Sequence, residues 1–146
     1  MSDREDPPGG RILLAADDDL FRDMLAADLR SDGHVVVEAE DGDELADHVE
    51  VSVYRRGLRP APDVIISEIF LPGPSALRIL EQIREEELLT PMILVAALVD
   101  EATRADACRL GATAVFQRPL DMAALRRVVA DAIGARRRAE ALGDAE

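Results

Sequence analysis

The chain has 146 residues and 48% of them are hydrophobic, which suits one globular domain large enough to bury a core. Aspartate and glutamate outnumber lysine and arginine by 30 to 17, and the formal net charge of -13 argues against direct binding to nucleic acid. Because no apolar run is long enough to span a membrane and the single cysteine, Cys108, has no partner within the chain, we expect a cytoplasmic protein without a membrane partner.

The first half of the chain predicts two strands and two helices after a polar leader. Residues 1–10 are acidic or rich in proline and glycine, and we expect this leader to be disordered. The elements expected next are a strand over 12–16, a helix from about 20 that Gly33 ends, a strand over 34–38 and a helix from 43 to about 56. Three aspartates, 17–19, follow the first strand, and one of them is expected to cap the first helix.

The second half continues the same alternation. We expect strands over 64–67, 92–95 and 114–116, and helices that begin with the capping residues Ser75, Asp100 and Asp121. A proline, Pro91, ends the first of these helices, and a glycine at position 111 ends the second. The folded domain is expected to cover residues 11–134, and residues 135–146 are expected to form either an extension of the last helix or a linker tail.

Strand and helix alternate five times, and the strands are continuously apolar. Such strands are typical of a parallel sheet that is covered by helices on both faces. With right-handed crossovers, the expected fold is an α/β doubly wound three-layer sandwich. Ligands of sheets of this kind bind beyond the carboxyl ends of the strands.

Charged residues gather where the predicted strands end. Asp17 and Asp18 follow the first strand, Glu68 ends the third, and Arg118 follows the fifth. Carboxylates that meet at one edge of a sheet need compensation, because like charges disfavour one another's ionised form. A hard cation such as Mg2+, or the guanidinium of Arg118, could supply that compensation.

An ordered set of short motifs resembles the receiver domains of bacterial two-component response regulators. The motifs are the first strand with its acidic cluster, Asp41-Gly42, the segment from Pro62 to Glu68, Leu71-Pro72-Gly73, Pro91 to Leu94, Gly111-Ala112 and Arg118-Pro119-Leu120. The resemblance covers roughly residues 11–134. It implies a CheY-like, flavodoxin-like fold, in which a five-stranded parallel sheet of order 2-1-3-4-5 is covered by five helices. It also implies a phosphoryl transfer, with Mg2+, from a histidine kinase to an aspartate that ends the third strand.

The sequence departs from the family at its functional positions. The phosphoacceptor position falls on Glu68, the hydroxyl position on Ala96, the aromatic-switch position on Val115 and the lysine position on Arg118. Aligned without a gap, the family's acidic pair falls on Ala16 and Asp17, and with a one-residue shift it falls on Asp17 and Asp18. Should Mg2+ bind, its candidate ligands are Asp17, Asp18 and Glu68.

These departures predict a degenerate receiver that has lost aspartyl phosphorylation. Glutamate reaches about 1.5 Å further than aspartate, which misplaces its oxygen for in-line attack. Ala96 has no hydroxyl for a phosphoryl oxygen, so we expect Glu68 to pair with Arg118 instead. The expected function is a phosphorylation-independent protein-interaction module in signalling, which is not an enzyme and needs no cofactor. Its expected partner is a histidine kinase or an output protein.

Several alternatives stay open at this point. Glu68 could be a carboxylate that faces water and has no role, or the chain could be a working receiver that accepts a phosphoryl group with Mg2+. An unrelated enzyme or nucleotide-binding protein of similar fold is a third possibility, although the sequence has no glycine-rich phosphate loop. A homodimer through the last two helices is as compatible with their mixed charge as a solvated face is.

Overall fold

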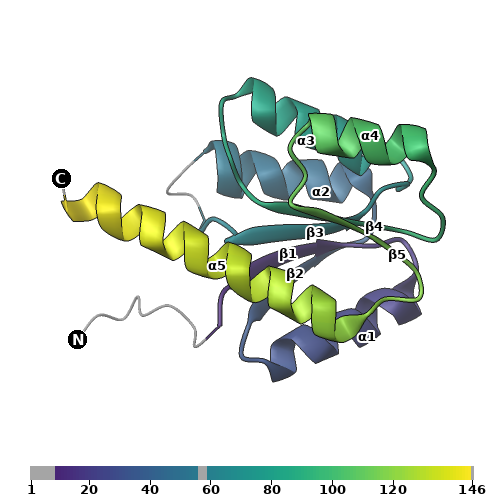
Figure 1. The fold of residues 1–146 in the computed structure, drawn as a ribbon, viewed down its shortest axis with the longest axis horizontal. Coiled ribbons are helices and arrows are strands. Elements are labelled where there is room, and N and C mark those ends of the chain that lie inside the picture. Colours follow the sequence, from purple (N-terminus) through teal and green to yellow (C-terminus); the bar gives the residue numbers. More distant parts are fainter. Residues whose placement is uncertain (1–8, 56–58, 146) are drawn as a thin grey trace.

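A computed structural model describes residues 9–55 and 59–145 (Figure 1). Five parallel strands form one sheet in the order β2-β1-β3-β4-β5. The strands are β1 (Arg11–Ala15), β2 (Val35–Ala39), β3 (Val64–Glu68), β4 (Met92–Ala96) and β5 (Ala114–Gln117). The predicted parallel sheet and its strand order are therefore confirmed.

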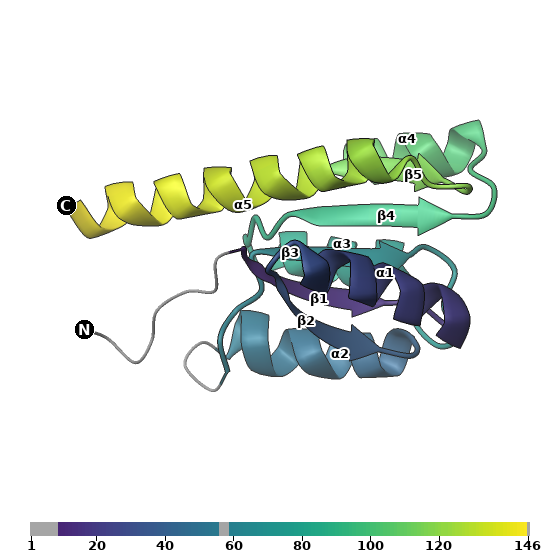
Figure 2. The same cartoon turned by 90° about the horizontal axis from the view of Figure 1, so that it is seen from below.

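Helices cover both faces of this sheet and make it the middle of three layers (Figures 1 and 2). One face packs against α1 and α5, and the other packs against α2, α3 and α4. The helices are α1 (Asp19–Ser31), α2 (Gly42–Val49), α3 (Ala76–Glu85), α4 (Glu101–Arg109) and α5 (Met122–Ala145), with a π-helical turn η1 (Glu50–Tyr54) after α2.

The core explains why the strands are continuously apolar. Consecutive residues of a strand point to opposite faces, so that Ile65 packs under α2, α3 and α4 while Ile66 packs under α1 and α5. Neither side chain is exposed to solvent. Full burial of a side chain of this size contributes about 1.5–3 kcal/mol, and the sheet therefore gains stability from both of its faces.

The predicted helix starts are confirmed by hydrogen bonds at the helix caps. In each case a side-chain oxygen accepts a backbone N–H three residues further along the chain, which satisfies a donor that the helix leaves unpaired. The bonds run to Asp18 from Phe21 at 3.1 Å, to Ser75 from Arg78 at 3.3 Å, to Asp100 from Thr103 at 2.8 Å and to Asp121 from Ala124 at 3.1 Å. Of the three aspartates after β1, Asp18 is thus the cap.

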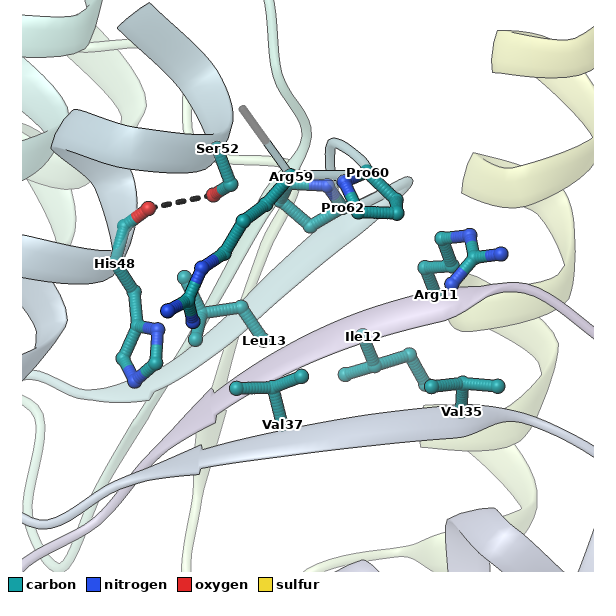
Figure 3. A pocket seen from close by; sticks show the side chains of 10 residues that line it. All are labelled: Arg11, Ile12, Leu13, Val35, Val37, His48, Ser52, Arg59, Pro60 and Pro62. Atoms are coloured by element: carbon teal, nitrogen blue, oxygen red, sulfur yellow. Dashed lines mark hydrogen bonds between the residues drawn. The ribbon is translucent and has the colours of Figure 1, made fainter. Parts of the chain in front are cut away.

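The second helix differs from its prediction. It ends as an α-helix at Val49 and continues as the π-helical turn η1 to Tyr54, and residue 56 lies outside the described residues. The hydroxyl of Ser52 donates to the carbonyl of His48 at 2.6 Å (Figure 3). A hydroxyl that binds the carbonyl four residues back competes with the backbone bonds of the helix and favours a distorted turn.

The start of the chain is ordered earlier than predicted. Gly10 donates its N–H to Nδ1 of His34 at 2.8 Å, and Gly9 donates to the carbonyl that precedes His34 at 3.1 Å. Position 10 has no room for a side chain, because a Cβ at Gly10 would lie 2.5 Å from Cδ1 of Ile133. The predicted disordered leader is therefore wrong for these two glycines, and residues 1–8 lie outside the described residues.

The last helix extends beyond the sheet (Figures 1 and 2). Of the two predictions for residues 135–146, the structure has the helix, as far as Ala145. Arg136 and Arg137 on this extension approach Asp63, whose carboxylate oxygens lie 3.8 and 3.9 Å from their nearest nitrogens. Within the ranges that the structure describes, no helix is long and apolar enough to cross a membrane.

Candidate functional site

The carboxyl edge of the sheet brings Glu68 and Arg118 together. Glu68 is the last residue of β3, and Arg118 directly follows β5. Strand β4 lies between them, and the carbonyl of its last residue, Ala96, accepts the N–H of Arg118 at 3.0 Å. The backbone therefore fixes the start of the arginine side chain at the end of β5, and its length lets it reach across β4 to Glu68.

Both oxygens of the Glu68 carboxylate have partners. Oε1 accepts the backbone N–H of Asp17 at 2.8 Å, and Oε2 accepts a hydrogen bond from Nη2 of Arg118. The side chain of Glu68 is only 15% exposed, so its charge faces these donors instead of open water. The predicted pairing with Arg118 is present, although the guanidinium offers one nitrogen to Glu68 and the backbone of the loop after β1 supplies the second donor.

Arg118 also contacts an aromatic ring. Its guanidinium carbon lies 3.7 Å from the centroid of the Phe21 ring. Its Nε atom is buried and has no hydrogen-bond partner within the described residues. Arg118 is joined to Pro119 by a cis peptide bond. No sequence pattern identifies Phe21 as part of the site, because an aromatic residue in the first turn of a helix gives no sign of what its ring covers.

The acidic cluster after β1 does not converge on one point. Asp18 caps α1, and the side chain of Asp19 pairs with Arg22 at 2.6 Å. Asp17 is exposed and contributes its backbone N–H to Glu68. Ala16 is fully buried and has no carboxylate to add. Each aspartate therefore has a separate structural environment.

Arg22 is a buried cation that the sequence analysis missed. Its Nη1 donates to the carbonyl of Ala16 at 2.7 Å, and its other nitrogens approach three carboxylates. Burial by itself lowers the pKa of Arg22, but the hydrogen bond and charge of Asp19, together with Glu38 and Glu40, outweigh it and raise the pKa above its usual value. The spacing of Asp19 and Arg22, three residues apart on α1, was the available signal.

The two remaining family positions carry apolar side chains. Ala96 ends β4 and is buried, so no hydroxyl stands beside Glu68 at this point of the edge. Val115 lies in β5, half-buried against the core under α2, α3 and α4. The aromatic residue of β5 is its neighbour Phe116, which packs on the opposite face of the sheet.

The residues present do not fit a Mg2+ site. A hard cation needs several oxygen ligands, and the first position of the gap-free acidic pair is Ala16. The cap bond occupies an oxygen of Asp18, and donors face both oxygens of Glu68. Within residues 9–55 and 59–145, no group of three or more acidic, histidine or cysteine side chains is arranged to hold a metal ion.

The amino ends of the strands carry a separate pocket. A pocket of about 110 Å³ lies at the amino ends of β1 and β2, with His48 and Arg59 on one side and Val35 and Val37 on the other (Figure 3). None of the candidate site residues lines it. The site around Glu68 is identified by its charged groups and its place at the strand ends.

Sequence comparisons identify the family. The model of the response regulator receiver domain matches residues 12–130. The "Regulator of RpoS" of Escherichia coli (strain K12) is 33% identical over 122 residues, which are 83% of this chain and 34% of that protein. The "Response regulator protein PmrA" of Pseudomonas aeruginosa is 34% identical over 112 residues, 77% of this chain and 47% of that protein. The chain thus spans about a third to a half of the length of these relatives.

Solved structures agree on the fold. The receiver domain of the Francisella response regulator 1452 superposes with a TM-score of 0.76 at 19% identity and covers 87% of this chain and 98% of that one. The receiver domain of a LuxO repressor protein from Vibrio parahaemolyticus gives 0.79 at 18% identity, with 92% and 97% covered. With the family model matching most of its length, the chain belongs to the response regulator receiver domains of two-component signalling.

Proposed function

We propose that this receiver domain has lost aspartyl phosphorylation and acts as a phosphorylation-independent protein-interaction module. One observation carries the proposal: both oxygens of Glu68, at the phosphoacceptor position, are held by donors of the chain itself. A carboxylate in this state is not free to attack a phosphoryl donor. We call the arrangement of Glu68, Arg118 and the N–H of Asp17 the closed site.

The surroundings of Glu68 support the same conclusion. Acyl phosphate formation needs a nucleophilic oxygen placed in line with the leaving group, and the longer glutamate side chain is instead directed at Arg118. Ala96 offers no hydroxyl and Ala16 no carboxylate, so groups that would hold a phosphoryl oxygen or a metal ion are missing. Glu68 carries one negative charge where a phosphate carries about -1.5 to -2. The closed site therefore resembles a phosphorylated site only in part.

A site that is not phosphorylated keeps the same charge, so it gives the domain no switch between two conformations. We propose a domain that is held in one conformation and signals by binding, without enzymatic activity, in the cytoplasm. Its partner would be a histidine kinase or an output protein, since receiver domains work with both. A homodimer through α4 and α5 stays a prediction.

The decisive experiment offers the protein a phosphoryl donor. We expect no gain of a phosphoryl group in intact-mass measurements after incubation with acetyl phosphate and Mg2+. Isothermal titration with beryllofluoride and Mg2+ should show no binding heat. Covalent phosphate on Glu68 would overturn the proposal in favour of a working receiver that takes its phosphoryl group from a histidine kinase.

A rescue experiment tests whether the named positions are the cause. The variant that combines Ala16→Asp, Glu68→Asp, Ala96→Thr and Arg118→Lys restores the family's side chains at four positions and leaves Val115 unchanged. We expect it to be phosphorylated in part. The matched control replaces Ala96→Thr with Ala97→Thr, which puts the hydroxyl on the neighbouring exposed residue. We expect less phosphorylation of this control. Equal labelling of the two variants would show that the hydroxyl position plays no part.

A further inference from the structure

The ring of Phe21 covers the guanidinium of Arg118. The guanidinium carbon lies 3.7 Å from the ring centroid, which places the cation against the face of the ring. A guanidinium in this position is attracted by the negative face of the aromatic quadrupole. Phe21 belongs to the first turn of α1 and Arg118 to the loop after β5, so the contact joins two elements that are far apart in the sequence.

The hydrogen bonds of Arg118 do not by themselves fix its plane. Within the described residues its side chain donates one hydrogen bond, from Nη2 to Glu68, and its buried Nε atom has no partner. A single bond allows the guanidinium to rotate. A groove of about 430 Å³, lined by Phe21 and Met24 among others, lies beside it and leaves the guanidinium room to move. A second contact is needed to keep Arg118 on Glu68.

Phe21 is placed to provide that contact, because its own backbone is held by the acidic cluster. Its N–H donates to the capping carboxylate of Asp18 at 3.1 Å. The preceding residue, Asp17, donates its N–H to Glu68 at 2.8 Å. The contacts therefore run in a closed ring from Asp17 through Glu68, Arg118 and Phe21 to Asp18, which is bonded covalently to Asp17.

We propose that Phe21 is a positioning residue, whose ring holds Arg118 on Glu68 and thereby keeps the closed site closed. The inference rests on the proposed function, since it explains how that site is maintained. It gives the acidic cluster a role without metal: Asp17 acts through its backbone and Asp18 through its cap. It also makes the first turn of α1 part of the closed site, so that a displacement of this turn releases Arg118.

The direct test follows the Nε–H group of Arg118 by NMR. Stacking on a ring shifts its proton signal to lower frequency, and burial slows its exchange with water. Phe21→Leu keeps an apolar side chain but removes the ring face, and we expect the shift to vanish and the exchange rate to rise at least about tenfold. Phe21→Tyr should retain both properties. Met24→Leu, a change at an exposed residue that lines the same groove, should also leave them unchanged.

A thermodynamic cycle supplies a second readout. Glu68→Gln and Arg118→Met, singly and together, give the coupling of the two side chains as a ratio of unfolding equilibrium constants. We expect a coupling of about tenfold, equivalent to ~1.4 kcal/mol, and a loss of most of it when Phe21→Leu is added. A purely structural role of Phe21 would lower stability but leave this coupling intact.

The two proposals fail by different results. If Phe21→Leu leaves the Arg118 signal and the coupling unchanged, Phe21 is not a positioning residue, even when the native chain resists phosphorylation. If the native chain takes up phosphate from acetyl phosphate while Phe21→Leu abolishes the coupling, the proposed loss of phosphorylation is wrong and the role of the ring stands.

Discussion

The two ends of β3 carry the same arrangement of charges. At its carboxyl end, Glu68 accepts the backbone N–H of Asp17 with one oxygen and faces an arginine with the other. Near its amino end, the buried carboxylate of Asp63 accepts the N–H of Arg11 at 2.8 Å and likewise faces arginine side chains. Each carboxylate thus binds the backbone at a different end of β1: Asp63 at its start and Glu68 just after its end.

The two carboxylates differ in how many other partners their arginines have. The arginines at the amino end have other partners, since Arg136 lies 3.5 Å from Glu140 and Arg137 donates to the carbonyl of Gly9 at 2.7 Å. Arg118 has no ion pair other than Glu68 within the part of the chain that the structure describes. Loss of the carboxylate should therefore leave a half-buried arginine without an ion pair only at the carboxyl end.

Among the changes at the two ends of β3, we expect Glu68→Gln to cause the largest loss of stability. A glutamine has one acceptor oxygen for two donors, so that either Arg118 or the N–H of Asp17 loses its partner. We expect the free energy of unfolding to fall by about 1–3 kcal/mol, the usual range for a half-buried donor left unsatisfied. The midpoint of urea unfolding measures the change. An unchanged midpoint would mean that the pair contributes nothing to stability.

The matched change at the amino end, Asp63→Asn, should cost less. The asparagine oxygen can still accept the N–H of Arg11, and Arg136 and Arg137 keep their other partners. We expect a loss of about 0.5–1.5 kcal/mol in the same urea experiment, as for one ordinary hydrogen bond. A loss larger than that of Glu68→Gln would mean that stability depends more on the carboxylate at the amino end than on Glu68.

We expect the smallest effect on stability from a change of pH, which acts on His34 near the amino end of the sheet. Burial lowers the pKa of His34, and the charge of Arg137 lowers it further, while Asp32 and Asp63 act in the opposite direction. The lowered pKa means that the unfolded chain takes up the proton first. The contribution of His34 to stability is therefore complete above its ordinary pKa of about 6.5 and is lost as the pH falls below that value.

The measurement is the urea midpoint of the native chain and of His34→Gln between about pH 7.5 and about pH 5.5, a range that brackets the ordinary histidine pKa. In the native chain Nδ1 of His34 accepts the N–H of Gly10, which requires the neutral ring. We expect the midpoint of the native chain to fall toward acid pH and that of His34→Gln to fall less. Parallel profiles would show that His34 does not report on the amino end.

Much of the fold could be predicted because its signals are local. Apolar runs mark the strands, and Asp18, Ser75, Asp100 and Asp121 mark the helix starts, since a cap needs only a side chain and an N–H three residues away. The prediction failed where a distant contact decides. Gly9 and Gly10 are held by hydrogen bonds to Gly33 and His34, which lie 24 residues further along the chain. The π-helical turn after Val49 is a different case, because the hydroxyl of Ser52 binds a carbonyl only four residues back.

The order of residues is enough to predict that Glu68 and Arg118 lie at one edge of the sheet, because parallel strands present their carboxyl ends together. It also determined which side chains are missing there, namely a hydroxyl at Ala96 and an aromatic ring at Val115. Two contacts become visible in the folded chain alone: the N–H of Asp17 donates to one oxygen of Glu68, and the ring of Phe21 covers Arg118. Backbone N–H groups and aromatic rings are common in any sequence. Only the packing of the folded chain brings particular ones into contact with a charged side chain.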